Sequence, residues 1–480
     1  MKKFLLIGAT ALMVSNSTFA GGILTNTNQN ATFLRNPARN AAIAIDGVYS
    51  NPAGIAFLPQ GFHLSVSWQA AWQKRVMDVN NQLFGMNADG KGTNREFVGE
   101  TNAPVIPSVQ AAYVINDKWS VSAQFAVGGG GGKCEFAEGL PMFEELIGGI
   151  VAKNKGTSYA LNQNLTGEQY FYAFQLGATY KLTDNFSVFG GARGVLANCN
   201  YTGAIANIKA NGMNAAEYAT LSAGAKAEAE KYAAQAAAAQ AAGNMAAAAQ
   251  LAGAAEQYAA AAVQAGTVAA MIGDYKLDCA QSGFGITPII GLDWNLGKLN
   301  LAAKYEFRTK INMENDSKNS PNVDALMPAY ADGGKVRSDI PALLTLGAQY
   351  QLSEAVRAMA GFHYYWDKDA KGSPIKNGKN TWEALLGIEW DMNDKIMLSL
   401  GGQRTDYNFA DSDMVDTNFN TPNYAVCLGG AYKFSEKMKL NVGYMHSFYE
   451  DHKVTSAASG VTRNYTRKND VVGASLDITF

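Results

Sequence analysis

Apolar and polar residues alternate with a period of two over many segments of this chain. From Tyr170 to Leu182, for example, every second residue is Tyr, Phe, Leu or Ala, and the residues between are mostly small, polar or charged. A period of two is typical of a β-strand with one apolar face. We count fourteen such segments, which start near residues 62, 107, 118, 168, 184, 276, 297, 338, 354, 380, 394, 421, 436 and 467.

The connections between these segments alternate strictly between short and long. Six are tight turns rich in the turn formers Asn, Asp, Gly and Ser; the other seven span roughly 76–106, 128–167, 202–275, 312–337, 368–379, 409–420 and 453–466. A soluble β-sandwich also alternates, but its strands are only ~5–6 residues long. Segments of about eleven residues can cross a bilayer when tilted. The pattern therefore predicts an all-β fold, a 14-stranded antiparallel transmembrane β-barrel.

The N-terminus predicts export. Met1–Lys3 is basic, Phe4–Val14 is apolar, and small residues precede Gly21, which is typical of a signal peptide over residues 1–20 cleaved after Ala20. Eleven apolar residues are too few for an anchor, which needs ~20. The last strand ends in Phe480 and resembles the C-terminal signal by which barrel-assembly machinery recognises outer-membrane proteins. We therefore expect a multi-pass barrel in a Gram-negative outer membrane, in contact with its lipid.

Two regions do not fit the wall of a barrel over residues 62–480. Residues 21–61 lack alternation and are predicted to form an N-terminal hatch, or plug. Residues 203–275 form an insertion whose central 60 positions, 211–270, hold 29 Ala, the strongest helix former. Gly243-Asn244 divides it, so we expect a helical hairpin of two arms, 214–242 and 245–272, outside the membrane. It is either a plain insertion or a surface that gathers hydrophobic ligand.

Composition and reactive side chains exclude several function classes. Charged residues are 17% of the chain and the net charge is −2, so no basic surface is available for nucleic acid. The four Cys form no CxxC, and we expect no metal and no cofactor. Cys199 and Cys279 fall on neighbouring strands, which leaves open a disulfide or two free thiols. His446 and Ser447 lie on opposite faces of one strand, so we expect no enzyme.

One motif in the predicted hatch points to a family. Asn51-Pro52-Ala53 follows Asp46–Ser50 and precedes the first strand. Together with the fourteen strands and the terminal Phe, it resembles the FadL/TodX family of outer-membrane transporters of long-chain fatty acids and other hydrophobic compounds. A second copy, Asn36-Pro37-Ala38, lies fifteen residues earlier; the resemblance does not account for it.

The resemblance implies a gate. In the family the hatch contacts an inward kink of strand three, through which ligand leaves sideways into the membrane. Here Asn51, Pro52 and Ala53 would be the gating residues, and Gly128, Gly129 and Gly130, in a run of five glycines, would be the kink. Alternatively, the glycine run merely begins an outer loop.

The cargo is less well defined. The resemblance favours passive transport of hydrophobic small molecules, long-chain fatty acids first. Arg193 and Arg308 are candidates for holding a carboxylate, which Arg binds bidentately; alternatively, they pair with lumen acids. Other hypotheses are uptake of haem or aromatic compounds, a surface-binding barrel protein built around the Ala-rich arms, and a general polar porin.

Overall fold

The computed structural model describes residues 22–480, so the predicted signal peptide lies outside the described residues. Seventeen strands form one sheet. Fourteen of them make a barrel wall: β1 (Gly61–Asn80), β2 (Asn94–Val114), β3 (Trp119–Phe136), β4 (Tyr159–Thr183), β5 (Phe186–Ala210), β6 (Tyr275–Asn295), β7 (Leu299–Glu306), β10 (Leu343–Gln351), β11 (Val356–Tyr365), β12 (Trp382–Asp391), β13 (Ile396–Asp406), β14 (Asn423–Ser435), β15 (Met438–Tyr449) and β17 (Thr462–Thr479). The short strands β8 (Asn312–Ser317), β9 (Lys335–Arg337) and β16 (His452–Thr455) belong to the long loops.

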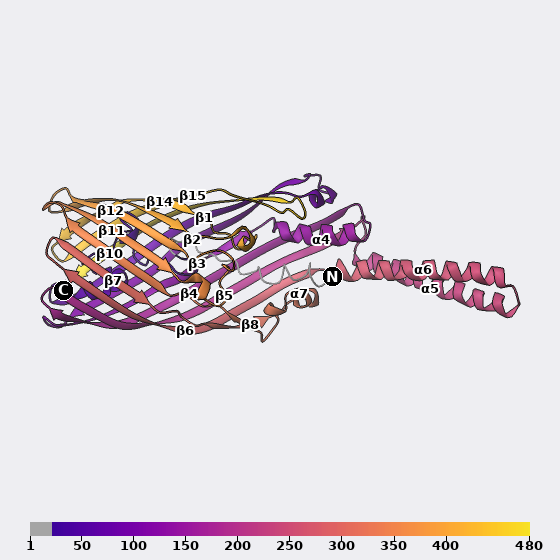
Figure 1. The fold of residues 1–480 in the computed structure, drawn as a ribbon, viewed down its shortest axis with the longest axis horizontal. Helices are drawn as coiled ribbons and strands as arrows, with labels where there is room; N and C mark the ends of the chain where they lie inside the picture. Colours follow the sequence, from indigo (N-terminus) through magenta and orange to yellow (C-terminus); the bar gives the residue numbers. More distant parts are fainter. Residues whose placement is uncertain (1–21) are drawn as a thin grey trace.

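The sheet closes on itself (Figure 1). β1 pairs antiparallel with β17, from His63–Thr479 to Asn80–Thr462, and with β2 on its other side. Closure removes the unpaired edges that lipid would penalise. The predicted 14-stranded antiparallel barrel is confirmed, as is the alternation of short turns at one end, the turn end, with long connections at the other, the loop end.

Several strands are longer than predicted. β2 begins at Asn94 rather than near residue 107, and β4 begins at Tyr159 rather than near 168. A tilted strand needs only about 9–11 residues to cross the hydrocarbon, so these 21- and 25-residue strands continue beyond it. The apolar face fades there, which is why alternation missed their outer parts.

The outward face of the wall is apolar and bounded by aromatic residues. Beside the short turns stand exposed rings of Trp119, Trp294, Tyr350, Trp390 and Tyr432. Nearer the loop end stand those of Trp72, Tyr172, Phe284, Tyr424 and Phe448, with exposed Leu, Ile and Val between the two rings. An apolar band between aromatic girdles is the lipid-facing surface of a membrane barrel.

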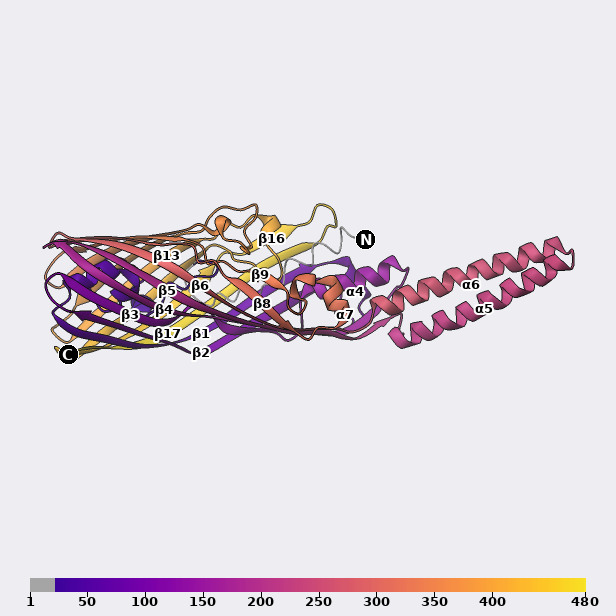
Figure 2. The ribbon, with the colours of Figure 1, turned by 90° about the horizontal axis from the view of Figure 1, so that it is seen from below.

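Helices lie at the loop end and inside the barrel. The helical insertion is confirmed as α5 (Ala215–Ala241) and α6 (Met245–Met271), which project away from the barrel (Figure 2). Shorter helices in the long connections are α4 (Pro141–Lys153), α7 (Pro321–Leu326), η2 (Gln82–Met86), η3 (Pro328–Tyr330), η4 (Asp367–Asp369) and η5 (Asp411–Asp413). None of the helices between residues 22 and 480 is long and apolar enough to cross a membrane.

Residues 22–60, the described part of the predicted hatch, run through the barrel interior. They contain α2 (Thr32–Arg35), α3 (Gly47–Ser50) and η1 (Pro52–Phe57). Nearly all of them are buried, and their polar groups bond to strands on every side of the wall. The hatch therefore fills the lumen, and its contacts define the site described next.

Candidate gate and ligand path

The wall is interrupted between β2 and β3. The two strands pair from Ser108–Ala126 to Val114–Ser120, and again at Thr101–Cys134 and Glu100–Glu135. Between these stretches, residues 102–107 of β2 have no partner on β3. Pro104 and Pro107 fall in that segment, and proline has no N–H to leave without a partner. The result is a gap in the hydrogen-bonded wall, here called the side gap.

Glycines shape the β3 side of the gap. The pairing of β3 with β4 shifts between Val127 and Gly129 and again between Gly130 and Gly132. Gly130 and Gly131 have φ angles of 65° and 108°, which only glycine adopts readily. The candidates Gly128, Gly129 and Gly130 all lie at this double bulge. The alternative that the glycines begin an outer loop is wrong, because β3 continues to Phe136.

The first described part of the hatch, Leu24–Gln29, occupies the gap and is called the arm. The backbone N–H of Asn26 donates to Gly128 O at 3.0 Å. Its side-chain amide donates to Val127 O at 3.2 Å and Gly130 O at 3.0 Å. A cavity of about 10 Å³ remains between the arm, Ile106 and Val127. The arm thus replaces the missing wall contacts and seals the gap.

The motif Asn51-Pro52-Ala53 binds β4, β5 and β6, the three strands that follow β3 around the wall. Asn51 Nδ2 donates to Asp293 Oδ2 on β6 at 2.5 Å. The Pro52 and Ala53 carbonyls accept hydrogen bonds from Thr179 on β4 and Ser187 on β5, at 2.8 and 2.7 Å. The hatch therefore bonds to the kinked strand through its arm, whereas Asn51–Ala53 forms a seat on β4–β6.

Arg193 lies beneath this part of the hatch. Its Nη1 donates to Glu306 at 2.6 Å, its Nε and Nη2 donate to Gln175, and its guanidinium lies over the Tyr49 ring at 5.2 Å. Lys304 donates to the Tyr49 carbonyl at 2.7 Å. In the closed barrel Arg193 thus holds the hatch, and an incoming carboxylate would compete with Glu306.

The structure does not bring the two arginine candidates together. Arg308 lies at the loop end, where its guanidinium is 3.8 Å from the Asp339 carboxylate and donates to the Asp369 carbonyl. Both arginines are paired with acids in this structure, Arg193 with Glu306 and Arg308 with Asp339, as the alternative to carboxylate binding expected.

Sequence reasoning missed the contacts of the first Asn-Pro-Ala copy. Glu389 on β12 accepts hydrogen bonds from Arg35 at 2.5 Å, Arg39 at 2.8 Å and Arg357 at 2.6 Å. Arg39 also forms a two-bond contact with Asp46, at 2.8 and 2.9 Å. Burial raises the pKa of Asp46, but the Arg39 guanidinium outweighs it and holds that pKa below its usual value.

A ring of glycines accommodates the same hatch segment, Leu34–Asn40. A Cβ atom built on any of seven wall glycines would lie less than 3.0 Å from an atom of this segment. One stands on each of seven consecutive strands, β10 to β15 and β17: Gly347, Gly361, Gly387, Gly401, Gly429, Gly443 and Gly473. These glycines let the hatch lie flush against the wall; a signal existed in the sequence as a recurring Gly in the later strands.

Between the hatch and the loop end the interior is apolar. Buried aromatic and aliphatic side chains form one cluster, called the outer core, which includes Phe84, Phe136, Tyr201, Met313, Tyr330, Phe419 and Tyr465. Leu24 and Phe171, beside Gly129, belong to the same cluster. Apolar contact is therefore continuous from the loop end to the side gap.

Helix α4 covers part of the outer core. Arg463 donates to Glu145 Oε2 at 2.6 Å, and the Met142 N–H donates to Asp416 at 2.9 Å. Burial raises the pKa of both Glu145 and Asp416, although Arg463 opposes that shift. These polar contacts fasten the helix over an apolar surface.

All four cysteines are described, and all are buried free thiols, so of the two alternatives left open for Cys199 and Cys279 the structure has free thiols and no disulfide. The two strands do pair, but Cys199 faces Gln281, and Cys279 faces Tyr201. The cysteines are thus two positions out of register, and both contribute to the outer core.

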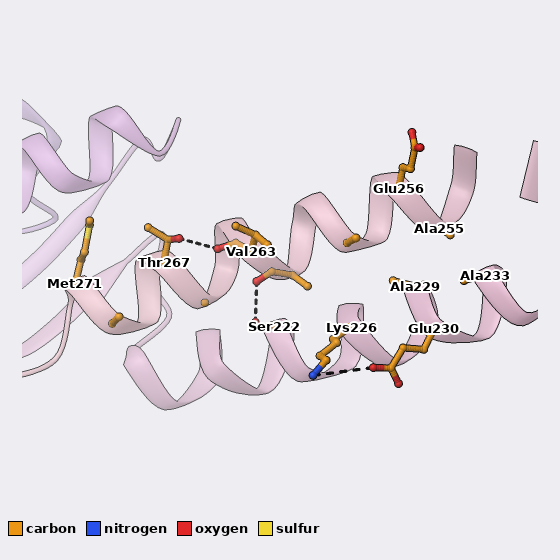
Figure 3. Close-up of a pocket in the computed structure, with 14 residues that line it drawn as sticks. Ser222, Lys226, Ala229, Glu230, Ala233, Ala255, Glu256, Val263, Thr267 and Met271 are labelled. Carbon is orange, nitrogen blue, oxygen red and sulfur yellow. Dashed lines mark hydrogen bonds and ion pairs between the residues drawn. The ribbon is translucent and has the colours of Figure 1, made fainter. Parts of the chain in front are cut away.

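An open groove lies far from the hatch, between α5 and α6. It has a volume of about 930 Å³ and is lined by small residues with Val263 and Met271. Lys226, Glu230 and Glu256 stand at its edges (Figure 3). None of the residues that line this groove belongs to the side gap or the arm.

We expect docking of the hatch to depend on pH through Asp46. Because its pKa is lower in the docked hatch, the Asp46–Arg39 pair stabilises the docked conformation of the hatch fully above the usual carboxylate pKa of about 4, and this stabilisation is lost as the pH falls from there through the lowered pKa. Hydrogen exchange of residues 32–46, corrected for intrinsic rates, should be slow at pH 7 and faster at pH 3. Asp46→Asn should remove most of this difference; equal protection at both pH values would contradict the assignment.

We also expect that a side chain at any glycine of the ring would clash with the docked hatch. Gly401→Ala should place a methyl group against Pro37 and destabilise the docked hatch by about 1–3 kcal/mol, as overpacking does. Gly402→Ala is the matched control, because its methyl would meet only Ala425 O, at 3.5 Å. Thermal unfolding and hatch exchange should change for Gly401→Ala alone; equal behaviour of the two variants would rule out the tight fit.

No family model and no curated protein sequence matches the chain. Solved structures do. A FadL homologue of Pseudomonas aeruginosa matches with a TM-score of 0.61 at 13% identity, covering 96% of this chain and 100% of that one. The toluene transporter TodX of Pseudomonas putida gives 0.52 at 13% identity over 95% and 99% of the two chains. The toluene transporter TbuX of Ralstonia pickettii matches with a TM-score of 0.50 at 12% identity, covering 94% of this chain and 99% of that one. The chain is an outer-membrane β-barrel with the FadL fold.

Proposed function

We propose that this protein is a passive channel for hydrophobic compounds, long-chain fatty acids first, in the Gram-negative outer membrane. The observation that carries the proposal is the side gap: a break in the wall, filled by a hatch arm, at the inner end of an apolar core. A polar solute needs no opening toward lipid. A molecule that partitions into lipid does, because it then avoids an aqueous path.

The proposed path follows the apolar contacts. Ligand is captured at the long loops, enters the outer core as α4 and the neighbouring loops yield, and binds above the hatch. Movement of the hatch arm frees the gap at Gly128–Gly130, and Asn51, Pro52 and Ala53 are the gating motif because their seat on β4–β6 holds the hatch from which the arm extends. Ligand then leaves between β2 and β3 into the membrane. Transport follows the gradient, and we propose no enzymatic step.

Chemistry supports more than one cargo. The outer core is rich in aromatic rings, which suit acyl chains and flat aromatic compounds alike, and TodX and TbuX are named as toluene transporters. Arg193 and Arg308 remain the proposed carboxylate contacts for a fatty acid. Uptake of haem or aromatic compounds is the alternative. A role in surface binding would require the α5–α6 hairpin, and its removal would then abolish binding but not uptake.

A general polar porin is the weaker candidate. Two cavities inside the barrel have volumes of only about 10 Å³ each, and charged hatch and wall residues pair across the lumen. Assembly into the membrane is proposed to use Phe480, whose ring lies 5.5 Å from that of Phe62, where β1 and β17 meet.

Uptake of a labelled long-chain fatty acid should require the hatch seat. In an uptake-deficient Gram-negative host, the intact protein should support uptake, and Asn51→Ala with Pro52→Ala should reduce it severalfold, because the seat loses its Asp293 contact and its rigid turn. The matched control is Pro321→Ala with Asn322→Ala, the same residue types on the outer helix α7. Uptake that is unchanged by the hatch variant would contradict the gating role of Asn51–Ala53. If the well-folded intact protein supports no uptake, long-chain fatty acids are not its cargo.

Weakening the arm should make the barrel leak sideways. Asn26→Ala removes two side-chain hydrogen bonds from β3, at a cost of about 1–3 kcal/mol for the carbonyls left behind. Cells with this variant should take up a hydrophobic dye faster than cells with Asn200→Ala, a change on the exposed outer face of β5. Equal rates in the two strains would count against the side gap as the exit.

A further inference from the structure

The hatch carries a second Asn-Pro-Ala copy that the proposed gate does not use. We propose that this copy and its surroundings, Leu34–Asn40, form a fixed clamp on the wall, and that opening is confined to the arm. Arg35, Asn36 and Arg39 are then positioning residues for transport, with Glu389 as their partner. The proposal deepens the proposed function and rests on it.

The fit of the clamp leaves no room for movement along the wall. Leu34 and Arg35 contact the glycines of β14, β15 and β17, and Asn36 and Pro37 contact those of β12 and β13. Asn40 reaches β10 and β11, where its amide donates to Leu346 O at 3.0 Å. The segment therefore spans seven strands, and any slide would drive it into a backbone on one side.

Charge holds the clamp as well. The cluster contains Arg35, Arg39 and Arg357 against Glu389, Asp46 and Asp391, three positive and three negative groups joined by ion pairs of 2.5–2.8 Å; all but Arg357 and Asp391 are buried. Lifting the hatch would leave Glu389 with Arg357 alone and Arg35 without a carboxylate, whereas Arg39 would keep Asp46, which belongs to the hatch. Separating a buried ion pair is strongly unfavourable, so thermal motion rarely breaks this cluster.

The arm is held by weaker bonds. Asn26 bonds to β3 through neutral amide and carbonyl groups, and Asn28 exchanges hydrogen bonds with the Gln69 side chain at 3.1 and 2.6 Å. Breaking such neutral bonds costs less than separating a buried ion pair, even where the carbonyls are left without a partner. On the far side of the clamp, the seat at Asn51–Ala53 lies only eight residues before β1 and is tethered by it. Of the three parts of the hatch, the arm is therefore the one whose displacement costs the least free energy.

Cross-links can test which part moves. In full-length protein with the four native cysteines replaced by alanine, Asn40→Cys with His363→Cys, joined by a short bis-methanethiosulfonate, would lock the clamp through disulfides that reduction cleaves; the two native side chains lie 3.2 Å apart, and neither position is a ring glycine. Asn28→Cys with Gln69→Cys, joined by a short bismaleimide, would lock the arm. Each unlinked double variant is the control for its own linked form.

The expected result is a clear asymmetry. The clamp lock should leave uptake of labelled fatty acid or hydrophobic dye within about twofold of its reduced form, and the arm lock should abolish uptake of both. Loss of uptake in the clamp lock that returns on reduction would overturn the proposal. If the unlinked parents already fail to take up either compound, the proposed function fails rather than the clamp.

A charge variant gives an independent readout. Glu389→Gln should release the whole hatch and raise the passage of a small sugar in liposomes by about tenfold, since Arg35 and Arg39 lose the wall carboxylate that they share. Glu436→Gln, an exposed acid in a short turn, should leave the sugar rate unchanged. A Glu389→Gln protein that is heat-modifiable, hence folded, but as sugar-tight as Glu436→Gln would also overturn the clamp.

Discussion

The constraint on which this structure depends is that lipid satisfies no backbone hydrogen bond. Fourteen strands meet it by closing into a ring in which every wall strand pairs on both sides. The ring is interrupted between Thr101 and Ser108, and there the molecule uses two substitutes. Pro104 and Pro107 remove two donors, and the arm supplies Asn26 to the carbonyls of Val127, Gly128 and Gly130. The arm is thus structurally part of the wall, so the closed state is the one in which the wall is complete.

The hatch meets the wall through two kinds of contact with different costs of separation. Leu34–Asn40 uses paired charges and close packing against glycine, whereas the arm uses neutral amides. Separating Arg35 from Glu389 leaves two buried charges apart, which costs more than separating a neutral amide from a carbonyl. A plug built in this way can open at one place without being lost from the lumen. The same logic explains why Arg193, which stacks on Tyr49 and pairs with Glu306, belongs to the holding contacts of the closed barrel.

The sequence predicts the barrel well because its signal is local. Alternation, tight turns and the Ala-rich insertion each lie within a few consecutive residues, so fourteen strands and both helical arms could be located without knowledge of pairing. The site depends instead on register. Glu389 lies on the polar face of an alternating segment, but alternation says nothing of its three arginine partners, one of which, Arg35, lies 354 positions away in the chain. The seven glycines stand at one height only after the strands are aligned, and a two-residue offset separated Cys199 from Cys279. Pro104 was a local sign of the gap, but it fell in a part of β2 where alternation had faded.

The layering of the interior itself favours an exit through the side. A hydrophobic molecule in the outer core that continued toward the short turns would have to cross the buried charges around Glu389 and Glu306, where it could replace none of their hydrogen bonds. The way past the arm is different in kind: Ala103, Ile106 and Val127 line it and belong, with Phe33 and Leu34, to one apolar cluster. Apolar transfer free energy, roughly 25 cal/mol per Å², therefore stays favourable along the sideways route and is lost along the axial one. A polar solute experiences the reverse preference, but a hatch that fills the lumen blocks its route. The charged hatch thus blocks the axial route to hydrophobic molecules, and the apolar residues at the gap make the sideways route unfavourable for polar solutes.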